Sequence, residues 1–252
     1  MRTLLADIGN TAIKVGEPQS TILDTACRAP EWNLPLHELP PVDFGSTPTR
    51  WICVSVNPKG LQKFVGMVSD RQEASQLRIA SFAEFGLPVD VTEPDRLGMD
   101  RVAAASAAIR IKAPDSGAVV IDVGTATTVD AVTAEGQFLG GAILGSPDLL
   151  LRALNQNTQA LPQIAFEPNA EPPAAIGRNT EQAMASGAYW GQVGALNELI
   201  RQYQTRLGSS PEVMLCGGGS EAIAPHLHLP TRVFPGLVLA GLSTLAEAET
   251  GP

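Results

Sequence analysis

Two stretches of the sequence carry an aspartate where an apolar segment meets a turn of small residues. They read TLLADIGNTAIKVG (3–16) and AVVIDVGTATTVDAV (118–132). In each, a glycine two positions after the aspartate permits a sharp turn or a close approach of the backbone to a ligand. The Asn and Thr residues beside these glycines can direct N–H and hydroxyl groups at phosphate oxygens, as anion-binding turns do. We refer to residues 7–11 and 122–127 as the first and second phosphate turns.

Each turn contains an aspartate, Asp7 in the first and Asp122 in the second. Its carboxylate would repel a bound phosphate unless a cation lay between the carboxylate and the phosphate. Mg²⁺ in proteins is commonly held by one or two carboxylates together with substrate phosphates. The alternative is that each carboxylate only accepts hydrogen bonds within its own turn. Because the same arrangement occurs twice, the sequence favours a cation.

A third candidate is the glycine-rich segment CGGGSEA (216–222), which follows a predicted strand and precedes a predicted helix. Nucleotides often bind at such a position in α/β sheets. Three successive glycines leave room for an adenine or a ribose against the backbone. The sequence contains no Walker A motif, so it indicates a different nucleotide-binding scheme.

The segment LGMDRVAAASAA (97–108) places an aspartate and an arginine just ahead of an alanine-rich helix predicted from about Val102. A hydroxyl that attacks a γ-phosphate benefits from a carboxylate that accepts its proton, and Asp100 has the chemistry to do this. Arg101 can bind a substrate carboxylate through two hydrogen bonds. The alternative is that Asp100 caps the helix and Arg101 lies on the surface.

Other reactive side chains fit structural roles. His226 and His228 would share one face of a strand, but no third ligand is near them in the sequence, which argues against a zinc site. Cys216 ends an apolar strand and is expected to be a small buried residue. Tyr189 and Trp190 lie on a long predicted helix and are expected to make core or dimer contacts.

Composition and charge limit the class of protein. Of the 252 residues 44% are hydrophobic and 17% charged, as in well-cored globular proteins, and the net charge of −9 argues against nucleic-acid binding. Asp7 and Asn10 interrupt the apolar core that a signal peptide would need, and no apolar run approaches the ~20 residues of a membrane-spanning helix. The three cysteines are widely separated, which indicates a reducing cytoplasm rather than a disulfide framework.

The motifs lie among alternating predicted strands and helices, which is the pattern of an α/β fold. Residues 28–50 hold several prolines and are expected to form a loop-rich segment or a weak edge element. Predicted strands are 4–6, 12–15, 51–56, 77–82, 118–124, 127–132, 138–144 and 212–216, and predicted helices are about 59–71, from 102, 149–154, 180–208 and 235–249.

The two phosphate turns form a short internal sequence repeat, and each copy begins a strand-rich half of the chain. Two homologous α/β domains with a cleft between them would explain both the repeat and its spacing. We therefore expect a first domain at 1–115 and a second at 116–252.

Six motifs occur in the order seen in type III pantothenate kinases: DIGNTAIK, GMDR, DVGTATTVDAV, GGAIL, IGRNTEQAMASGAYWG and CGGG. The sequence thus resembles this family, which belongs to the superfamily of acetate kinase, sugar kinases, Hsp70 and actin. The resemblance implies two ribonuclease-H-like (actin-like ATPase) domains and a homodimer. It also implies ATP-dependent phosphorylation of pantothenate to 4′-phosphopantothenate, the first step of coenzyme A biosynthesis.

The resemblance carries roles onto single residues. Asp7 would organise the Mg²⁺ that accompanies ATP, and Asp122 matches the position that binds a monovalent cation, K⁺ or NH₄⁺. Lys14 would neutralise phosphate charge. The ATP contacts match Asp7, Ile8, Gly9, Asn10, Thr11, Ala12, Ile13, Lys14 and Thr125.

On the substrate side, Asp100 matches the general base of the family. Contacts to pantothenate match Gly98, Met99, Asp100, Arg101 and Thr180, and the last of these also suits a helix N-cap. One segment departs from the family, which usually has Pro-Gly where this chain has Gly145 and Ser146, followed by Pro147. Two alternatives are a non-catalytic regulatory homologue and a kinase of the same superfamily that acts on another small hydroxyl substrate.

Overall fold

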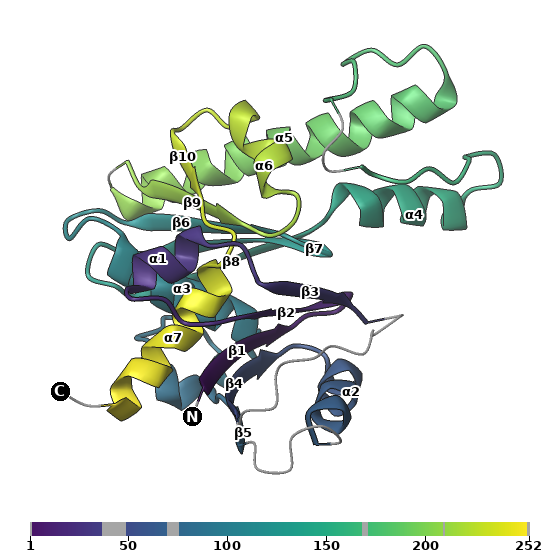
Figure 1. Ribbon diagram of the computed structural model, residues 1–252. Coiled ribbons are helices and arrows are strands. Elements are labelled where there is room, and N and C mark those ends of the chain that lie inside the picture. Colours follow the sequence, from purple (N-terminus) through teal and green to yellow (C-terminus); the bar gives the residue numbers. More distant parts are fainter. Residues whose placement is uncertain (1, 37–48, 70–75, 168–170, 209, 251–252) are drawn as a thin grey trace. The chain divides into compact units, whose positions relative to one another are not determined.

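The computed structural model describes residues 2–36, 49–69, 76–167, 171–208 and 210–250 (Figure 1). The chain forms two compact units, which are described separately. The first comprises Met1–Lys112, Gly136–Phe138 and Phe234–Pro252, and the second comprises Ala113–Glu135 and Leu139–Val233.

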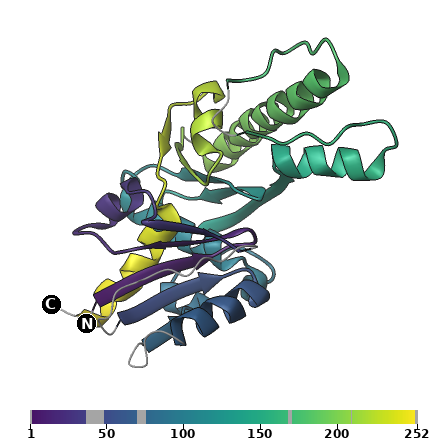
Figure 2. The same ribbon diagram turned by 45° about the vertical axis from the view of Figure 1, so that its right-hand side comes forward.

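The first unit is built on a five-stranded mixed sheet of order β3-β2-β1-β4-β5. Strand β1 pairs antiparallel with β2, which follows it directly, and parallel with β4 on its other side. Figures 1 and 2 show these three strands side by side. The strands are β1 (Arg2–Ile8), β2 (Ala12–Gly16), β3 (Trp32–Pro35), β4 (Thr49–Ser55) and β5 (Gln76–Ile79).

The sheet of the second unit has the order β10-β9-β6-β7-β8. Strand β6 pairs antiparallel with the following strand β7 and parallel with β9, just as β1 pairs with β2 and β4. Read from β8, the strand order therefore repeats that of the first unit. The strands are β6 (Ala118–Val123), β7 (Ala126–Val132), β8 (Phe138–Gly145), β9 (Glu212–Cys216) and β10 (Thr231–Val233). The predicted fold class, two ribonuclease-H-like α/β domains of the actin-like type, is confirmed.

Helices cover the sheets. Those of the first unit are α1 (Ile22–Cys27), α2 (Pro58–Ser69), the short turns η1 (Phe82–Phe85) and η2 (Pro94–Arg96), α3 (Met99–Ile111) and α7 (Leu237–Thr250). Those of the second are α4 (Pro147–Asn157), α5 (Thr180–Leu207), α6 (Ser220–Ile223) and the turn η3 (Ala224–His226). No helix in these described parts of the chain is long and apolar enough to span a membrane.

Side-chain alternation decides which way the key aspartates point. In β1, Leu4, Ala6 and Ile8 pack into a buried cluster with residues of α2. Because successive strand residues face opposite sides, Asp7 lies on the other face of the sheet. Helix α7 contacts both β1 and β4 and packs against α3.

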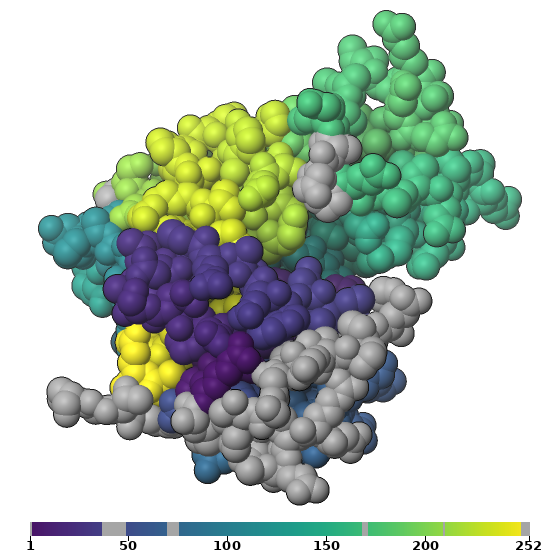
Figure 3. All heavy atoms as spheres, viewed as in Figure 1, coloured from purple at the N-terminus to yellow at the C-terminus, as the bar shows by residue number. Residues whose placement is uncertain are grey.

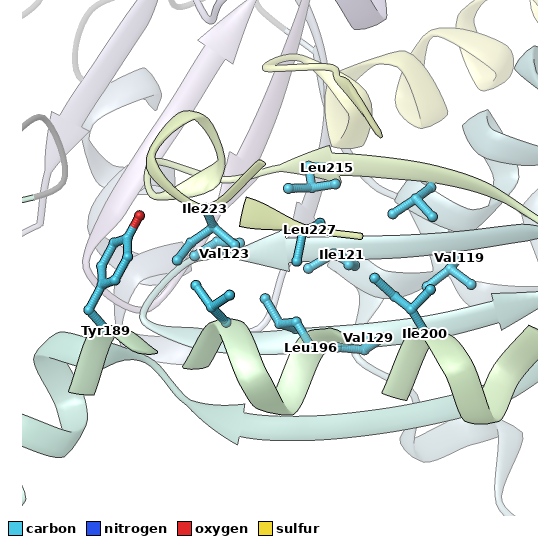
Figure 4. Packing of buried hydrophobic residues seen from close by; sticks show 12 residues of the cluster. Val119, Ile121, Val123, Val129, Tyr189, Leu196, Ile200, Leu215, Ile223 and Leu227 are labelled. Carbon is cyan, nitrogen blue, oxygen red and sulfur yellow. The ribbon is translucent and has the colours of Figure 1, made fainter. Parts of the chain in front are cut away.

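The second unit repeats this arrangement. Val119, Ile121 and Val123 of β6 pack against α5, in the cluster that Figure 4 shows. Asp122 lies between Ile121 and Val123 in the strand, so it points to the face opposite α5. In both units the aspartate therefore ends a buried strand and faces away from the apolar cluster that anchors that strand.

The end of the chain differs from the predicted domain boundary, which assigned residues 234–252 to the second domain. The structure groups Phe234–Pro252 with the first unit. Close packing explains this: a Cβ atom on Gly241 would lie less than 3.0 Å from the backbone of Ala103 in α3. The Gly236 N–H also donates to the Ala26 carbonyl of α1, at 2.9 Å. Figure 3 shows the resulting neighbourhood of N-terminal (purple) and C-terminal (yellow) residues.

Local signals predicted several element ends correctly. Helix α5 begins after Asn179, whose side chain accepts from the Gln182 N–H, and ends at Gly208 in the left-handed conformation. The loop-rich expectation for residues 28–50 agrees with a short edge strand, β3, while residues 37–48 lie outside the described part of the chain.

The cysteines give a simple check of this packing. Cys53 and Cys216 are buried, as predicted for Cys216, and burial raises the pKa of the Cys53 thiol, whereas Cys27 is exposed. A thiolate-specific reagent is therefore expected to label Cys27 rapidly in the native protein and the other two thiols only after denaturation. Mass spectrometry of labelled peptides measures this. Fast labelling of Cys53 in native protein would contradict the burial of β4.

Candidate active site

The first phosphate turn connects β1 to β2. The Gly9 N–H donates to the Ala12 carbonyl at 3.0 Å and closes the turn. The Asn57 side chain donates to the Gly9 carbonyl at 3.3 Å and supports the turn from the start of α2. Asn10 and Thr11 are exposed at its tip. The turn thus presents amide and hydroxyl groups to the surroundings, as a phosphate contact requires.

Asp7 is nearly buried, and its carboxylate lies beside Lys14. The two residues are directly opposite each other in the β1–β2 pairing, and Lys14 Nζ is 3.8 Å from Asp7 Oδ2. The predicted role of Lys14 was phosphate neutralisation, and the structure places its ammonium group next to the predicted Mg²⁺ ligand. One buried carboxylate fits Mg²⁺ that takes its other ligands from phosphate and water. The described residues contain no cluster of three or more His, Cys, Asp or Glu that would hold a metal by itself.

The second phosphate turn connects β6 to β7 and is closed by the Gly124 N–H, which donates to the Ala126 carbonyl at 3.2 Å. Two buried oxygens here, Asp122 Oδ1 and Thr127 Oγ1, have no hydrogen-bond partner among the described residues. Burying a carboxylate oxygen without a partner costs free energy. A cation bound by Asp122 Oδ1 would remove this cost, so the site fits the predicted monovalent ion.

The glycine-rich segment joins β9 to α6 and packs directly on the second phosphate turn. The Gly219 N–H donates to the Val123 carbonyl at 3.0 Å. Gly217 has a φ of +86°, and a Cβ atom there would lie less than 3.0 Å from Asp122 Oδ1. Gly218 is exposed, and a Cβ on it would meet no described atom within 4 Å. The open surface at Gly218 suits the predicted adenosine contact.

Asp100 and Arg101 lie in the first turn of α3, which begins at Met99 and not at the predicted Val102. An acidic residue in a first turn is favoured by the helix dipole, which explains the earlier start. The N-cap is Gly98, so Asp100 is not the capping residue that the alternative interpretation proposed. Its Oδ1 accepts from the Arg101 N–H at 2.8 Å.

Two neighbours fix the orientation of this pair. A Cβ atom on Gly98 would lie 2.6 Å from Asp100 Oδ1, so the absence of a side chain there leaves room for the carboxylate. The Arg101 guanidinium carbon lies 5.7 Å from the ring centroid of Phe138, a cation–π arrangement. Phe138 is fully buried, and backbone hydrogen bonds with Pro88 and Asp90 hold it in place.

Thr180 is the first residue of α5 and is exposed. The Asn179 side chain caps the helix, and Gln182 Oε1 accepts from the Arg178 N–H at 2.8 Å, so both sides of the helix start are fixed. Gly177 packs against this turn: a Cβ there would lie less than 3.0 Å from the backbone of Ala183. Thr180 is therefore presented by a rigid helix end.

Gly177→Ala is expected to push the loop away from α5, to lower stability by about 1–2 kcal/mol, and to raise KM for the substrate that Thr180 is predicted to contact about three- to tenfold. The reason is that the new methyl group meets backbone atoms, which cannot turn aside. Steady-state kinetics and thermal unfolding measure both effects. Gly66→Ala, in an open position of α2, is the matched control and is expected to stabilise the protein slightly. An unchanged KM in Gly177→Ala would contradict the role of this helix end.

Sequence reasoning predicted no contact for two residues next to the site: Phe138, and Ser146, which it noted only as a departure from the family. Phe138 lies beneath Arg101, and Ser146 donates to the Thr125 carbonyl at 2.8 Å. The signal for Ser146 was present in the sequence, because Ser followed by Pro is typical of an N-cap and the first helical residue. Phe138 had no local signal, since its contact with Arg101 depends on tertiary structure.

The aromatic residues of α5 have structural roles. Tyr189 is buried in the core cluster, as predicted, and its hydroxyl donates to the Ala222 carbonyl at 2.6 Å. His226 packs edge-to-face on Tyr189 and Trp190, with ring centroids 5.7 and 5.0 Å away. Tyr189 thus connects α5 to the helix that follows the glycine-rich segment.

Comparison with known proteins agrees with the family resemblance that the sequence motifs indicated. The sequence model of the family described as type III pantothenate kinase matches residues 3–202. A type III pantothenate kinase of Gluconobacter oxydans (strain 621H) is 35% identical over 205 residues, which cover 81% of this chain and 74% of that protein. One of Roseiflexus sp. (strain RS-1) is 34% identical over 256 residues, covering 97% and 98%.

Among solved structures, a protein from Campylobacter jejuni that is described as a conserved putative Baf family transcriptional activator is similar to this chain. It superposes with a TM-score of 0.62 at 19% sequence identity, covering 98% of both chains. At this identity the similarity concerns the fold alone.

Proposed function

Since the chain belongs to the type III pantothenate kinase family, we propose that it transfers the γ-phosphoryl group of ATP to the 4′-hydroxyl of pantothenate. The product would be 4′-phosphopantothenate, and the reaction would begin coenzyme A biosynthesis in the cytoplasm. The observation that carries the proposal is the Asp100–Arg101 pair in the first turn of α3, where the Asp100 carboxylate accepts from the Arg101 backbone N–H and the Arg101 guanidinium lies over the Phe138 ring.

In the proposed reaction, Asp100 accepts the proton of the 4′-hydroxyl as the oxygen attacks the γ-phosphorus. The new O–P bond forms while the bond from the γ-phosphorus to the bridging oxygen breaks, and ADP leaves. Arg101 binds the pantothenate carboxylate, and the Phe138 ring holds its guanidinium in place. Thr180 and the backbone of Gly98 and Met99 complete the contacts to pantothenate.

On the nucleotide side, the first phosphate turn and Thr125 contact the phosphates of ATP. A magnesium ion held by Asp7 would neutralise charge on the phosphates, and Lys14 adds a second positive charge beside it. A potassium or ammonium ion would bind at Asp122 Oδ1. The buried, unpartnered state of that oxygen among the described residues supports this assignment.

We further propose a homodimer formed through the second unit. Several large apolar side chains are exposed there, with Ile143 65% and Ile176 83% accessible. Helix α5 also has an exposed face of glycines at 187, 191 and 194, where an added Cβ would meet no described atom within 4 Å. Exposed apolar side chains and a smooth helix face are features that a second subunit would cover.

The test of the proposed function is an assay of purified protein with ATP, Mg²⁺ and pantothenate, in potassium and then in sodium buffer. Phosphopantothenate is expected, with a higher rate in potassium, and is detected by mass spectrometry. Pantothenate without ATP is the control. ATP binding without turnover on pantothenate would favour a regulatory homologue, and turnover on another small alcohol would indicate a different kinase of this superfamily.

A further inference from the structure

Ser146 connects the second phosphate turn to helix α4. Its side chain is nearly buried, and its hydroxyl makes two hydrogen bonds. The hydroxyl donates to the Thr125 carbonyl at 2.8 Å and accepts from the Leu149 N–H at 3.2 Å, which caps α4. The family resemblance leads one to expect glycine here, and glycine has no group that could make either contact.

The carbonyl groups of the second phosphate turn are held by three different partners. Val123 O accepts from the Gly219 N–H at 3.0 Å, and Ala126 O accepts from the Gly124 N–H at 3.2 Å. Thr125 O accepts from Ser146. Of these three hydrogen bonds, the one to Thr125 is made by a side chain, so a substitution can remove it without altering the backbone.

Fixing the Thr125 carbonyl also fixes the next N–H group. A trans peptide is planar and points its N–H away from its C=O, and the structure contains no cis peptide among the described residues. The hydrogen bond from Ser146 therefore sets the direction of the Ala126 N–H as well. In a phosphate turn, backbone N–H groups of this kind bind the ligand.

We propose that Ser146 is a positioning residue for ATP, which acts through the Thr125–Ala126 peptide. The inference rests on the proposed function, because it takes the second phosphate turn as a contact of the ATP phosphates. The Ser146 hydroxyl couples the start of α4 to the conformation of the second phosphate turn. A residue that merely capped α4 would stabilise the helix and leave nucleotide affinity unchanged.

The experiment compares Ser146→Ala, Ser146→Thr and Thr21→Ala with the wild type. Thr21 caps α1 in the first unit by accepting from the Asp24 N–H at 3.1 Å, so its removal matches the loss of a cap without touching the turn. The dissociation constant of a non-hydrolysable ATP analogue with Mg²⁺ is measured by calorimetry. KM for ATP and for pantothenate and the unfolding temperature are measured alongside it.

Ser146→Ala is expected to raise the dissociation constant and KM for ATP about three- to tenfold, with KM for pantothenate changed less than about twofold. Ser146→Thr keeps a hydroxyl that donates and accepts and is expected to restore affinity. Thr21→Ala is expected to lower the unfolding temperature only. Wild-type affinity in Ser146→Ala, or an equal loss in Thr21→Ala, would overturn the proposal.

Nucleotide binding is measured without turnover, so a wild type that binds ATP but does not phosphorylate pantothenate would refute the proposed function separately.

Discussion

Asp100→Asn is expected to lower kcat about 10²- to 10⁴-fold, because the amide cannot accept the proton of the attacking hydroxyl. The asparagine side chain has nearly the same shape as the aspartate side chain, and its amide oxygen can still accept from the Arg101 N–H. Folding and the KM for ATP are therefore expected to stay close to those of the wild type. Steady-state kinetics at saturating ATP, together with a circular dichroism spectrum, measure these quantities.

The matched control is Asp95→Asn, which changes an exposed carboxylate in the turn just before α3. It removes the same charge from the same region and is expected to leave kcat unchanged. If Asp100→Asn retained a quarter or more of wild-type kcat, Asp100 would not be the general base. Equal losses in both variants would instead assign the effect to the local negative charge.

Gly217→Ala is expected to destabilise the protein by about 2–4 kcal/mol and to abolish the proposed activation by potassium. The backbone here has a φ of +86°, which L residues rarely adopt, and the new Cβ would lie less than 3.0 Å from the backbone of Val123. It would lie equally close to Asp122 Oδ1, the proposed cation ligand. Relieving these contacts requires the segment to move away from the turn or the Asp122 carboxylate to turn aside, and either change disturbs the proposed cation site.

Gly218→Ala separates this effect from a general intolerance of the glycine-rich segment. Its Cβ would meet no described atom within 4 Å, and its φ lies outside the left-handed region. The variant is expected to keep the wild-type unfolding temperature. Thermal unfolding and the rate as a function of potassium concentration are measured for both variants. Similar stability of the two variants would show that the close contact at Gly217 does not exist in solution.

The local elements were predictable because their signals are local. Asn179 and Gly208 delimit α5 through a side-chain cap and a left-handed glycine, both of which depend on a few neighbouring residues. The two phosphate turns were predicted from an apolar strand, an aspartate and a glycine. The repeat of these turns also predicted the repeated sheet, because similar motifs at corresponding positions of two halves indicate the same fold in each half.

Contacts between distant segments were not predictable from one sequence. The placement of α7 depends on the fit of Gly241 against Ala103, and no pattern in residues 234–250 specifies it. The contact of Phe138 with Arg101 and that of Ser146 with Thr125 likewise depend on which elements become neighbours. The start of α3 was predicted one turn too late, because the predicted helix followed the alanine run and left out the favourable Asp100.

The assignment of α7 to the first unit has a consequence for synthesis of the protein. Residues 139–233, which belong to the second unit, are synthesised before α7. The sheet of the first unit is therefore synthesised well before the helix that covers it. At ~5–20 residues per second, the interval from Lys112 to Thr250 is on the order of ten seconds. The second unit is therefore expected to become protease-resistant on the ribosome before the first does. Proteolysis of ribosome-bound chains arrested before and after residues 237–250 measures this order, and early resistance of the first unit would contradict it.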